Sequence, residues 1–177
     1  MANFHRAPNR LDPASYLGFQ EYFLTLCTDG KQKLFTNPAL VDSLLATLRE
    51  TCSVHHFAIS AYCFMPDHLH LLAQAKSKTC DLPVFVKAFK GRAAVGARRL
   101  GIRNLWQKGY YDHVARDSES SGEIAWYIFL NPVRARLASS PWEWPHSGSF
   151  VFDWKQLPVP AKTYTPHWKT QNQKLAT

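Results

Sequence analysis

Two apolar segments typical of β-strands lie so close together that they constrain the fold more than any other feature. Residues 56–64 and 68–73 are separated only by Met65-Pro66-Asp67. Because these residues suit a tight turn, the two segments predict a β-hairpin. Side chains alternate between the faces of a strand, so His68 and His70 are expected on one face and Leu69 and Leu71 on the other.

The remaining pattern predicts the order β-α-β-β-α-β, followed by one more helix. The predicted elements are strands at 21–27, 56–64, 68–73 and 105–116, and helices from Asn37-Pro38, at 82–100 and from about Glu123 with Ser121 as its cap. Gly91 and Gly96 weaken the helix propensity of 82–100. The order indicates an α+β, ferredoxin-like fold, in which an antiparallel sheet carries two helices on one face.

Composition divides the chain into an arm, a domain and a tail. Residues 1–18 contain Pro8 and Pro13 without periodicity and predict an extended arm, 19–150 hold the predicted elements, and 151–177 predict a C-terminal tail. With 177 residues and 46% hydrophobic residues, the chain suits one core. No apolar run is long enough for a membrane helix, residues 1–6 lack the apolar core of a secretory signal, and no C-x-x-C pair occurs. We expect a cytoplasmic protein with reduced thiols.

A formal net charge of +8 predicts a polyanionic partner. The cations cluster in the second predicted helix and just beyond it, beside Phe85, Phe89 and Trp106. Such a mixture suits phosphate contacts and base stacking. The candidate DNA-contacting residues are Lys87, Lys90, Arg92, Arg98 and Arg99. An ordinary amphipathic helix with a solvated basic face is the alternative.

His68 and His70 are candidate metal ligands, because neutral imidazole is the commonest protein metal ligand and a strand holds the pair rigidly. Two polar residues that face water or a carbonyl group are the simpler alternative. A longer H-x-H-x-D-H metallohydrolase run is disfavoured, since Leu72 and Ala73 occupy the positions of its acid and third histidine. Two ligands do not by themselves make a metal site.

Tyr127 and Asn131 are spaced four residues apart in the last predicted helix, so both can point toward the sheet. Pro132 disfavours continued helix at Asn131, which predicts a kink or restart there. Viewed alone, a tyrosine among apolar residues is ordinarily a core residue. Tyr110 and Tyr111 are rival candidates for a nucleophile.

Three ordered motifs resemble a known family: M-P-D-H-L-H-L-L, L-W-Q-K-G-Y-Y-D and Y-I-F-L-N-P-V-R-A-R-L. The chain is similar to the single-tyrosine HUH transposases of the IS200-like group, above all to the REP-associated tyrosine transposases, over approximately residues 22–147. This resemblance implies that 19–150 form an HUH transposase-like catalytic domain with a tyrosine-bearing C-terminal helix. It also implies a single-stranded DNA hairpin as substrate and either a monomer or a homodimer.

The resemblance further implies the roles of individual residues. His68 and His70 would bind Mg²⁺ or Mn²⁺, and Tyr127 would attack a DNA phosphodiester to form a 5′-phosphotyrosine. Asn131 would be the third metal ligand, where insertion-sequence members commonly carry Gln.

Two other functions remain open on the sequence. The first is a non-catalytic nucleic-acid-binding module on the same scaffold, although no RNA-recognition signature K/R-G-F/Y-G/A-F-V-x-F/Y occurs. The second is a structural metal-binding domain, which predicts neither salt-dependent DNA affinity nor a covalent DNA adduct.

Overall fold

The computed structural model describes residues 16–115, 120–160 and 164, and these form a five-stranded sheet in the order β4-β1-β3-β2-β5. All paired strands are antiparallel. The strands are β1 (Glu21–Cys27), β2 (Phe57–Met65), β3 (His68–Ala75), β4 (Tyr111–Val114) and β5 (Ser147–Gly148). The predicted ferredoxin-like α+β fold is therefore confirmed, with β5 as an added edge strand.

Four α-helices follow or join these strands, together with short 3-10 turns. The helices are α1 (Pro38–His55), α2 (Leu82–Arg99), α3 (Ser121–Phe129) and α4 (Asn131–Arg134). The 3-10 turns are η2 (Asp29–Lys31), η3 (Leu34–Thr36), η4 (Pro141–Glu143) and η5 (Trp154–Gln156). Among the described residues, no helix has the length and apolar character needed to cross a membrane.

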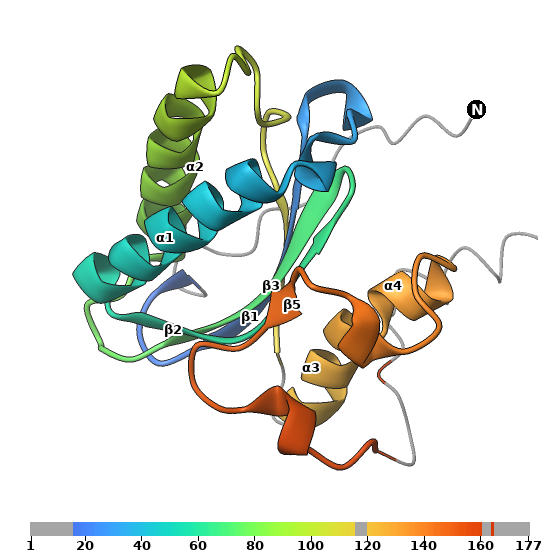
Figure 1. The fold of residues 1–177 in the computed structure, drawn as a ribbon. Coiled ribbons are helices and arrows are strands. Elements are labelled where there is room, and N and C mark those ends of the chain that lie inside the picture. Colours follow the sequence, from blue (N-terminus) through green and yellow to red (C-terminus); the bar gives the residue numbers. More distant parts are fainter. Residues whose placement is uncertain (1–15, 116–119, 161–163, 165–177) are drawn as a thin grey trace, which may run out of the picture.

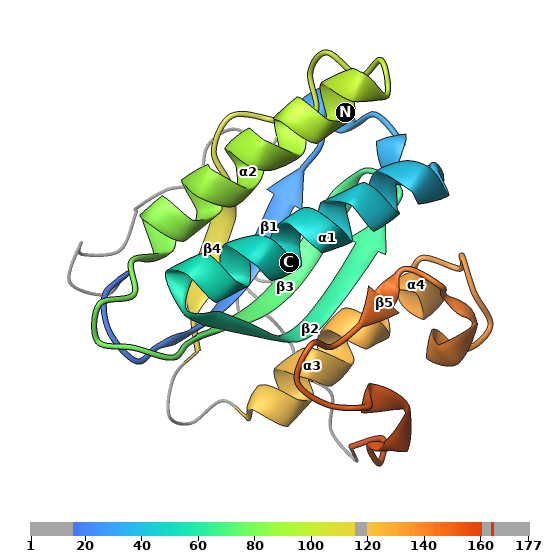
Figure 2. The ribbon, with the colours of Figure 1, turned by 60° about the vertical axis from the view of Figure 1, so that its left-hand side comes forward.

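The sheet separates two helical layers and two apolar cores. Helices α1 and α2 cover one face, while α3 and α4 lie against the other (Figure 1). Figure 2 shows α1 and α2 side by side across the sheet. Alternation along the strands supplies both cores: Leu69 and Leu71 pack beneath α1 and α2, whereas Phe23 and Leu72 pack beneath α3.

A register shift in β2 changes which of its side chains face α3. The pairing with β3 is irregular between Ile59 and Ala61. Ile59 consequently belongs to the core under α1 and α2, while Ala61 and Cys63 belong to the core under α3. The irregularity lets one strand contribute small side chains where α3 approaches the sheet.

The helix boundaries agree closely with the sequence prediction. The side chain of Asn37 caps α1 by accepting hydrogen bonds from the backbone N–H groups of Ala39 and Leu40. Helix α2 is continuous despite Gly91 and Gly96.

Helix α3 starts two residues earlier than predicted. The prediction made Ser121 its N-cap, but Ser120 is the N-cap and Ser121 is the first helical residue. The Ser121 hydroxyl instead donates to Glu21 on β1, which ties the start of α3 to the sheet.

The predicted strand at 105–116 is much shorter in the structure. Only Tyr111–Val114 pair as β4, and Trp106 makes an isolated bridge to Thr28. Gly109 has a positive φ of 78°, and the Lys90 ammonium donates to the carbonyl groups of Gln107 and Gly109. These carbonyl groups therefore bond to a side chain instead of a neighbouring strand.

Residues beyond β5 pack on the outer side of α3. The Trp154 ring stacks on Phe129 with centroids 4.3 Å apart, and the Trp126 indole donates to the Pro158 carbonyl at 2.9 Å. Residues 1–15 of the predicted arm and most of the tail beyond 160 lie outside the described residues. The three-part division of the chain remains a prediction.

The two glycines of α2 provide a test of the packing of this helix. A β-carbon at Gly91 would meet nothing within 4 Å, whereas one at Gly96 would lie 3.2 Å from the Ser43 hydroxyl on α1. We expect Gly91→Ala to raise the free energy of unfolding by about 0.5–1 kcal/mol, because alanine lowers the backbone entropy of the unfolded chain. Gly96→Ala should raise the free energy of unfolding by less, because its β-carbon would lie close to the Ser43 hydroxyl. Urea unfolding of both variants checks this, and a destabilised Gly91→Ala would contradict a continuous, open α2.

Candidate active site

The two histidines lie on the face of the sheet that α3 covers, within two rows of paired residues. One row runs Thr25, His70 and Cys63 across β1, β3 and β2. The next row runs Cys27, His68 and Met65. The strand alternation predicted from the sequence thus places both imidazoles on one face.

The imidazoles of His68 and His70 face each other through their Nε2 atoms, which are 3.1 Å apart. Each ring is held at its other nitrogen. The His68 Nδ1 lies 2.5 Å from the Asp67 carboxylate, and the His70 Nδ1 lies 2.9 Å from the Thr25 hydroxyl. His70 is 8% exposed. Both rings are therefore fixed by groups outside the pair.

This arrangement suits a cation between the two rings. A carboxylate only accepts hydrogen bonds, so Asp67 fixes the proton of a neutral His68 on Nδ1 and leaves a lone pair on Nε2. When the His70 Nδ1 donates to Thr25, a second lone pair faces the first. Two ligands at neighbouring octahedral positions, each about 2.1 Å from a metal, lie about 3.0 Å apart. The observed Nε2 spacing of 3.1 Å matches this value.

Burial lowers the pKa of His68, while the neighbouring Asp67 opposes the shift and Lys31 adds to it. The lowered pKa favours the neutral imidazole, which is the form that binds metal.

Lys31 is a cation near the histidines that the sequence analysis did not single out. Its ammonium donates to the Cys27 thiol at 3.1 Å, and Cys27 pairs with His68 across β1 and β3. The position of Asp29-Gly30-Lys31 directly after a strand was visible in the sequence. The pairing that brings this turn beside His68 was not.

Cys63 is an unfavourable metal ligand at this site. Cys63 pairs with His70, but burial raises the pKa of its thiol to about 12. Its Sγ lies 3.7 Å from the Met65 Sδ. Across the described parts of the chain, no group of three or more His, Cys, Asp and Glu residues could hold a metal. Further ligands would have to be of other kinds, such as an amide, water or phosphate oxygen.

Tyr127 lies on the same face as the histidines, separated from His70 by one aromatic ring. Its ring meets Phe23 edge-on with centroids 5.9 Å apart, and Phe23 stacks on His70 at 5.4 Å. Tyr164 meets the Tyr127 ring edge-on at 5.7 Å. Tyr127 is 6% exposed. The structure therefore places Tyr127 and the histidine pair on one face of the sheet, linked by the Phe23 ring.

Asn131 acts as a cap at the end of α3. Its Nδ2 donates to the carbonyl oxygens of Tyr127 and Ile128, at 3.0 and 3.2 Å. The last carbonyl groups of a helix need partners of this kind. An amide carries its donors and its acceptor on different atoms, so Oδ1 is the atom available to a metal. The role of Asn131 as third ligand stays a prediction.

The candidate DNA-contacting residues of α2 lie in the layer across the sheet from the histidines. Lys87, Arg98 and Arg99 are exposed. Lys90 donates to backbone carbonyl groups, and Arg92 forms an ion pair with Glu50. Contacts of these residues with DNA stay a prediction.

Other cations lie in loops at the end of the sheet that carries the histidine hairpin. The Thr28 N–H donates to the Asp67 carbonyl, and the Gln107 N–H donates to the Cys27 carbonyl. Both adjoining loops therefore lie beside His68. We call three of their exposed cations, Lys31, Lys33 and Lys108, the basic rim.

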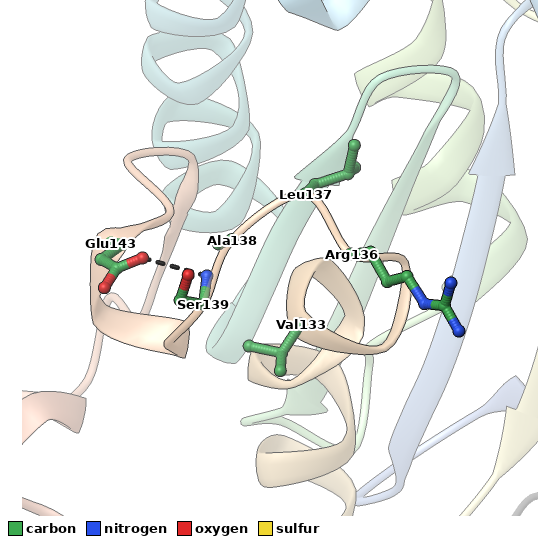
Figure 3. Close-up of a pocket in the computed structure, with 6 residues that line it drawn as sticks. All are labelled: Val133, Arg136, Leu137, Ala138, Ser139 and Glu143. Carbon is green, nitrogen blue, oxygen red and sulfur yellow. Dashed lines mark hydrogen bonds between the residues drawn. The ribbon is translucent and has the colours of Figure 1, made fainter.

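A hollow of about 470 Å³ lies on the segment from α4 to η4 (Figure 3). It is lined by Val133, Arg136, Leu137, Ala138, Ser139 and Glu143. The Ser139 N–H donates to the Glu143 carboxylate at 3.0 Å, whereas Arg136 extends away from Glu143. None of the predicted site residues lines this hollow.

The antiparallel sheet carries the paired histidines on its central strand, and Tyr127 on a following helix packs over the same face. Residues 19–129 match the family described as "Transposase IS200 like". The chain belongs to this family.

Individual relatives extend the comparison. A Haemophilus influenzae protein provisionally named a REP-associated tyrosine transposase is 23% identical over 158 residues, which cover 83% of this chain and 86% of that protein. The REP-associated tyrosine transposase of Escherichia coli K12 is 24% identical over 106 residues, or 55% of this chain and 62% of that protein. A solved REP-associated tyrosine transposase bound to a REP hairpin has the same fold, with a TM-score of 0.69 and 18% identity, covering 90% of this chain and 96% of that one.

The groups that hold the imidazoles should tune metal binding. We expect Thr25→Val and Asp67→Ala each to weaken Mn²⁺ binding by about 10- to 100-fold, because the rings lose the partners that fix their orientation and tautomer. Paramagnetic broadening of the imidazole NMR signals during a Mn²⁺ titration measures this. Thr36→Val, in an exposed turn, is the control. Unchanged affinity in both site variants would contradict the assignment.

Proposed function

We propose that this chain cleaves and rejoins single-stranded DNA by transesterification, with Tyr127 as the nucleophile. The observation that carries the proposal is the placement of Tyr127 and the histidine pair on one face, with Phe23 in contact with both the Tyr127 ring and the His70 ring. Membership in a transposase family supports it, because transposition requires DNA strands to be cut and joined.

The reaction exchanges one phosphodiester bond for another. The Tyr127 oxygen forms a bond to the phosphorus, and the bond from phosphorus to the 3′ oxygen of the preceding nucleotide breaks. The phenolic proton passes to solvent, and the departing oxygen takes up a proton to become a 3′-hydroxyl. The DNA 5′ end is left as a phosphotyrosine, and attack by a 3′-hydroxyl reverses the step without an external energy source.

His68 and His70 would hold Mg²⁺ or Mn²⁺, with Asn131 as a third protein ligand. When bound, such an ion polarises a phosphate oxygen and offsets the charge that develops during attack. Asp67 and Thr25 keep the two imidazoles oriented with their Nε2 atoms together.

The substrate class is single-stranded DNA, in the form of a hairpin-forming repeat. The net charge of +8 favours a polyanion, and the basic rim places cations beside His68. The fold neighbour bound to a REP hairpin supports the choice of a hairpin. Lys87, Lys90, Arg92, Arg98 and Arg99 would then contact DNA outside the reaction centre.

A non-catalytic nucleic-acid-binding module is the second candidate function. The low exposure of Tyr127, at 6%, favours it, because a nucleophile must reach the phosphate. Under this alternative, DNA binds at the basic rim and no covalent product forms.

Covalent trapping separates the two candidates. Wild-type protein incubated with single-stranded hairpin DNA and Mn²⁺ should form a protein–DNA adduct that is visible on a denaturing gel. Tyr127→Phe should form none, because only the attacking oxygen is removed, whereas Tyr110→Phe and Tyr111→Phe should retain it. No adduct from wild type across a broad hairpin library would favour the binding module. An undiminished adduct in Tyr127→Phe would refute the proposed nucleophile.

The histidines should affect cleavage far more than binding. For the His68→Ala and His70→Ala variants we expect at least about a 100-fold loss of cleavage rate, with DNA affinity within about threefold of wild type, since cations and not imidazoles carry the affinity. Cleavage assays and fluorescence anisotropy at matched salt measure the two quantities. Cleavage that persists in both variants would remove the histidines from the site.

A further inference from the structure

Arg134 contacts Tyr127 at both its ring and its backbone. The guanidinium carbon lies 4.1 Å from the centroid of the Tyr127 ring. The same guanidinium donates to the Tyr127 carbonyl oxygen at 2.5 Å. The described structure thus places a cation over the side chain that the proposed function makes the nucleophile.

The break between α3 and α4 leaves the Tyr127 carbonyl group to bond to side chains, while the helical turns on either side bring Arg134 back toward Tyr127. Helix α3 ends at Phe129, and Leu130 has φ −83° and ψ −2°. Proline at 132 has no N–H to continue the helical ladder, and α4 makes one further turn that ends at Arg134. Seven residues are close to two helical turns, so Arg134 returns to the side of Tyr127. The carbonyl oxygen of Tyr127 then accepts hydrogen bonds from both the Asn131 amide and the Arg134 guanidinium.

The two contacts have different chemical consequences. The bond to the carbonyl oxygen fixes the backbone from which the tyrosine projects. The cation over the ring is attracted to the negative face of the aromatic system, so it restrains the orientation of the Tyr127 ring. Burial lowers the pKa of Arg134, and Tyr127 and Cys63 oppose the shift. An arginine keeps its charge at any pH that the protein tolerates.

We propose that Arg134 is a positioning residue for the nucleophile: its guanidinium holds the Tyr127 ring and backbone in place for attack. This inference rests on the proposed function, because it has a consequence for catalysis only when Tyr127 attacks DNA. The alternative is a helix cap with no influence on the reaction.

Two substitutions separate these roles. Arg134→Met removes the charge and both contacts but keeps an unbranched side chain. Arg134→Gln removes the charge and keeps an N–H donor for the Tyr127 carbonyl. Arg136→Met is the matched control, since Arg136 is an exposed arginine two residues later whose side chain lines the hollow in Figure 3.

The readout compares the rate of adduct formation with DNA affinity. In single turnovers at saturating hairpin DNA and Mn²⁺, both Arg134 variants should react about 10- to 100-fold more slowly than wild type. Their Kd for the hairpin should change by less than about threefold, because Arg134 contacts Tyr127 and not the basic rim. Arg136→Met should react at the wild-type rate. Added guanidinium should restore part of the rate in Arg134→Ala.

The outcomes distinguish this inference from the proposed function. A folded Arg134→Gln that reacts within twofold of wild type, while Tyr127→Phe forms no adduct, overturns the role of Arg134 alone. An adduct in Tyr127→Phe overturns the proposed function instead. If thermal unfolding shows that Arg134→Met does not fold, the reaction rate of Arg134→Gln tests the role of Arg134, because glutamine keeps a hydrogen-bond donor for the Tyr127 carbonyl group.

Discussion

The alternation of side chains along β3 is the constraint on which the rest of the structure depends. It assigns Leu69 and Leu71 to the core beneath α1 and α2, and His68 and His70 to the face beneath α3. A shift of one residue would exchange the two sets. The apolar residues therefore fix the orientation of the histidines, because the cost of exposing two buried leucines far exceeds that of moving an imidazole.

Helix α3 completes the site through aromatic contacts. Phe23 contacts both the Tyr127 ring and the His70 ring, so one side chain of β1 sets the separation between Tyr127 and the histidine pair. Trp154 stacks on Phe129 from the outer side, which holds α3 between the sheet and the C-terminal segment. The position of Tyr127 thus follows from packing on both sides of its helix.

The sequence was sufficient for most of the fold because its periodic patterns are local. Strand alternation, the Asn37 cap and the break at Pro132 all depend on neighbouring residues, and each appears in the structure. The strand predicted at 105–116 was too long, since the bonds from Lys90 to the Gln107 and Gly109 carbonyl groups join segments far apart in sequence.

The site was predictable only in part for the same reason. Paired histidines on one face follow from spacing, but the contact between Phe23 and Tyr127 needs strand pairing and helix docking that no local pattern specifies. Lys31 and Arg134 were missed because their neighbours depend on a strand register and on a helix restart. The four-residue spacing between Tyr127 and Asn131 indicated a shared helix face. The hydrogen bonds from Asn131 to the α3 carbonyl groups could be identified only in the structure.

Direct mapping of a trapped adduct tests the central claim most sharply. A hairpin substrate with a 3′-bridging phosphorothiolate leaves a thiol that rejoins DNA poorly, so the covalent intermediate should accumulate. Mass spectrometry of the proteolysed adduct should find the 5′-phosphonucleotide on the peptide that contains Tyr127. A modification on Tyr110, Tyr111 or any other residue would contradict the account.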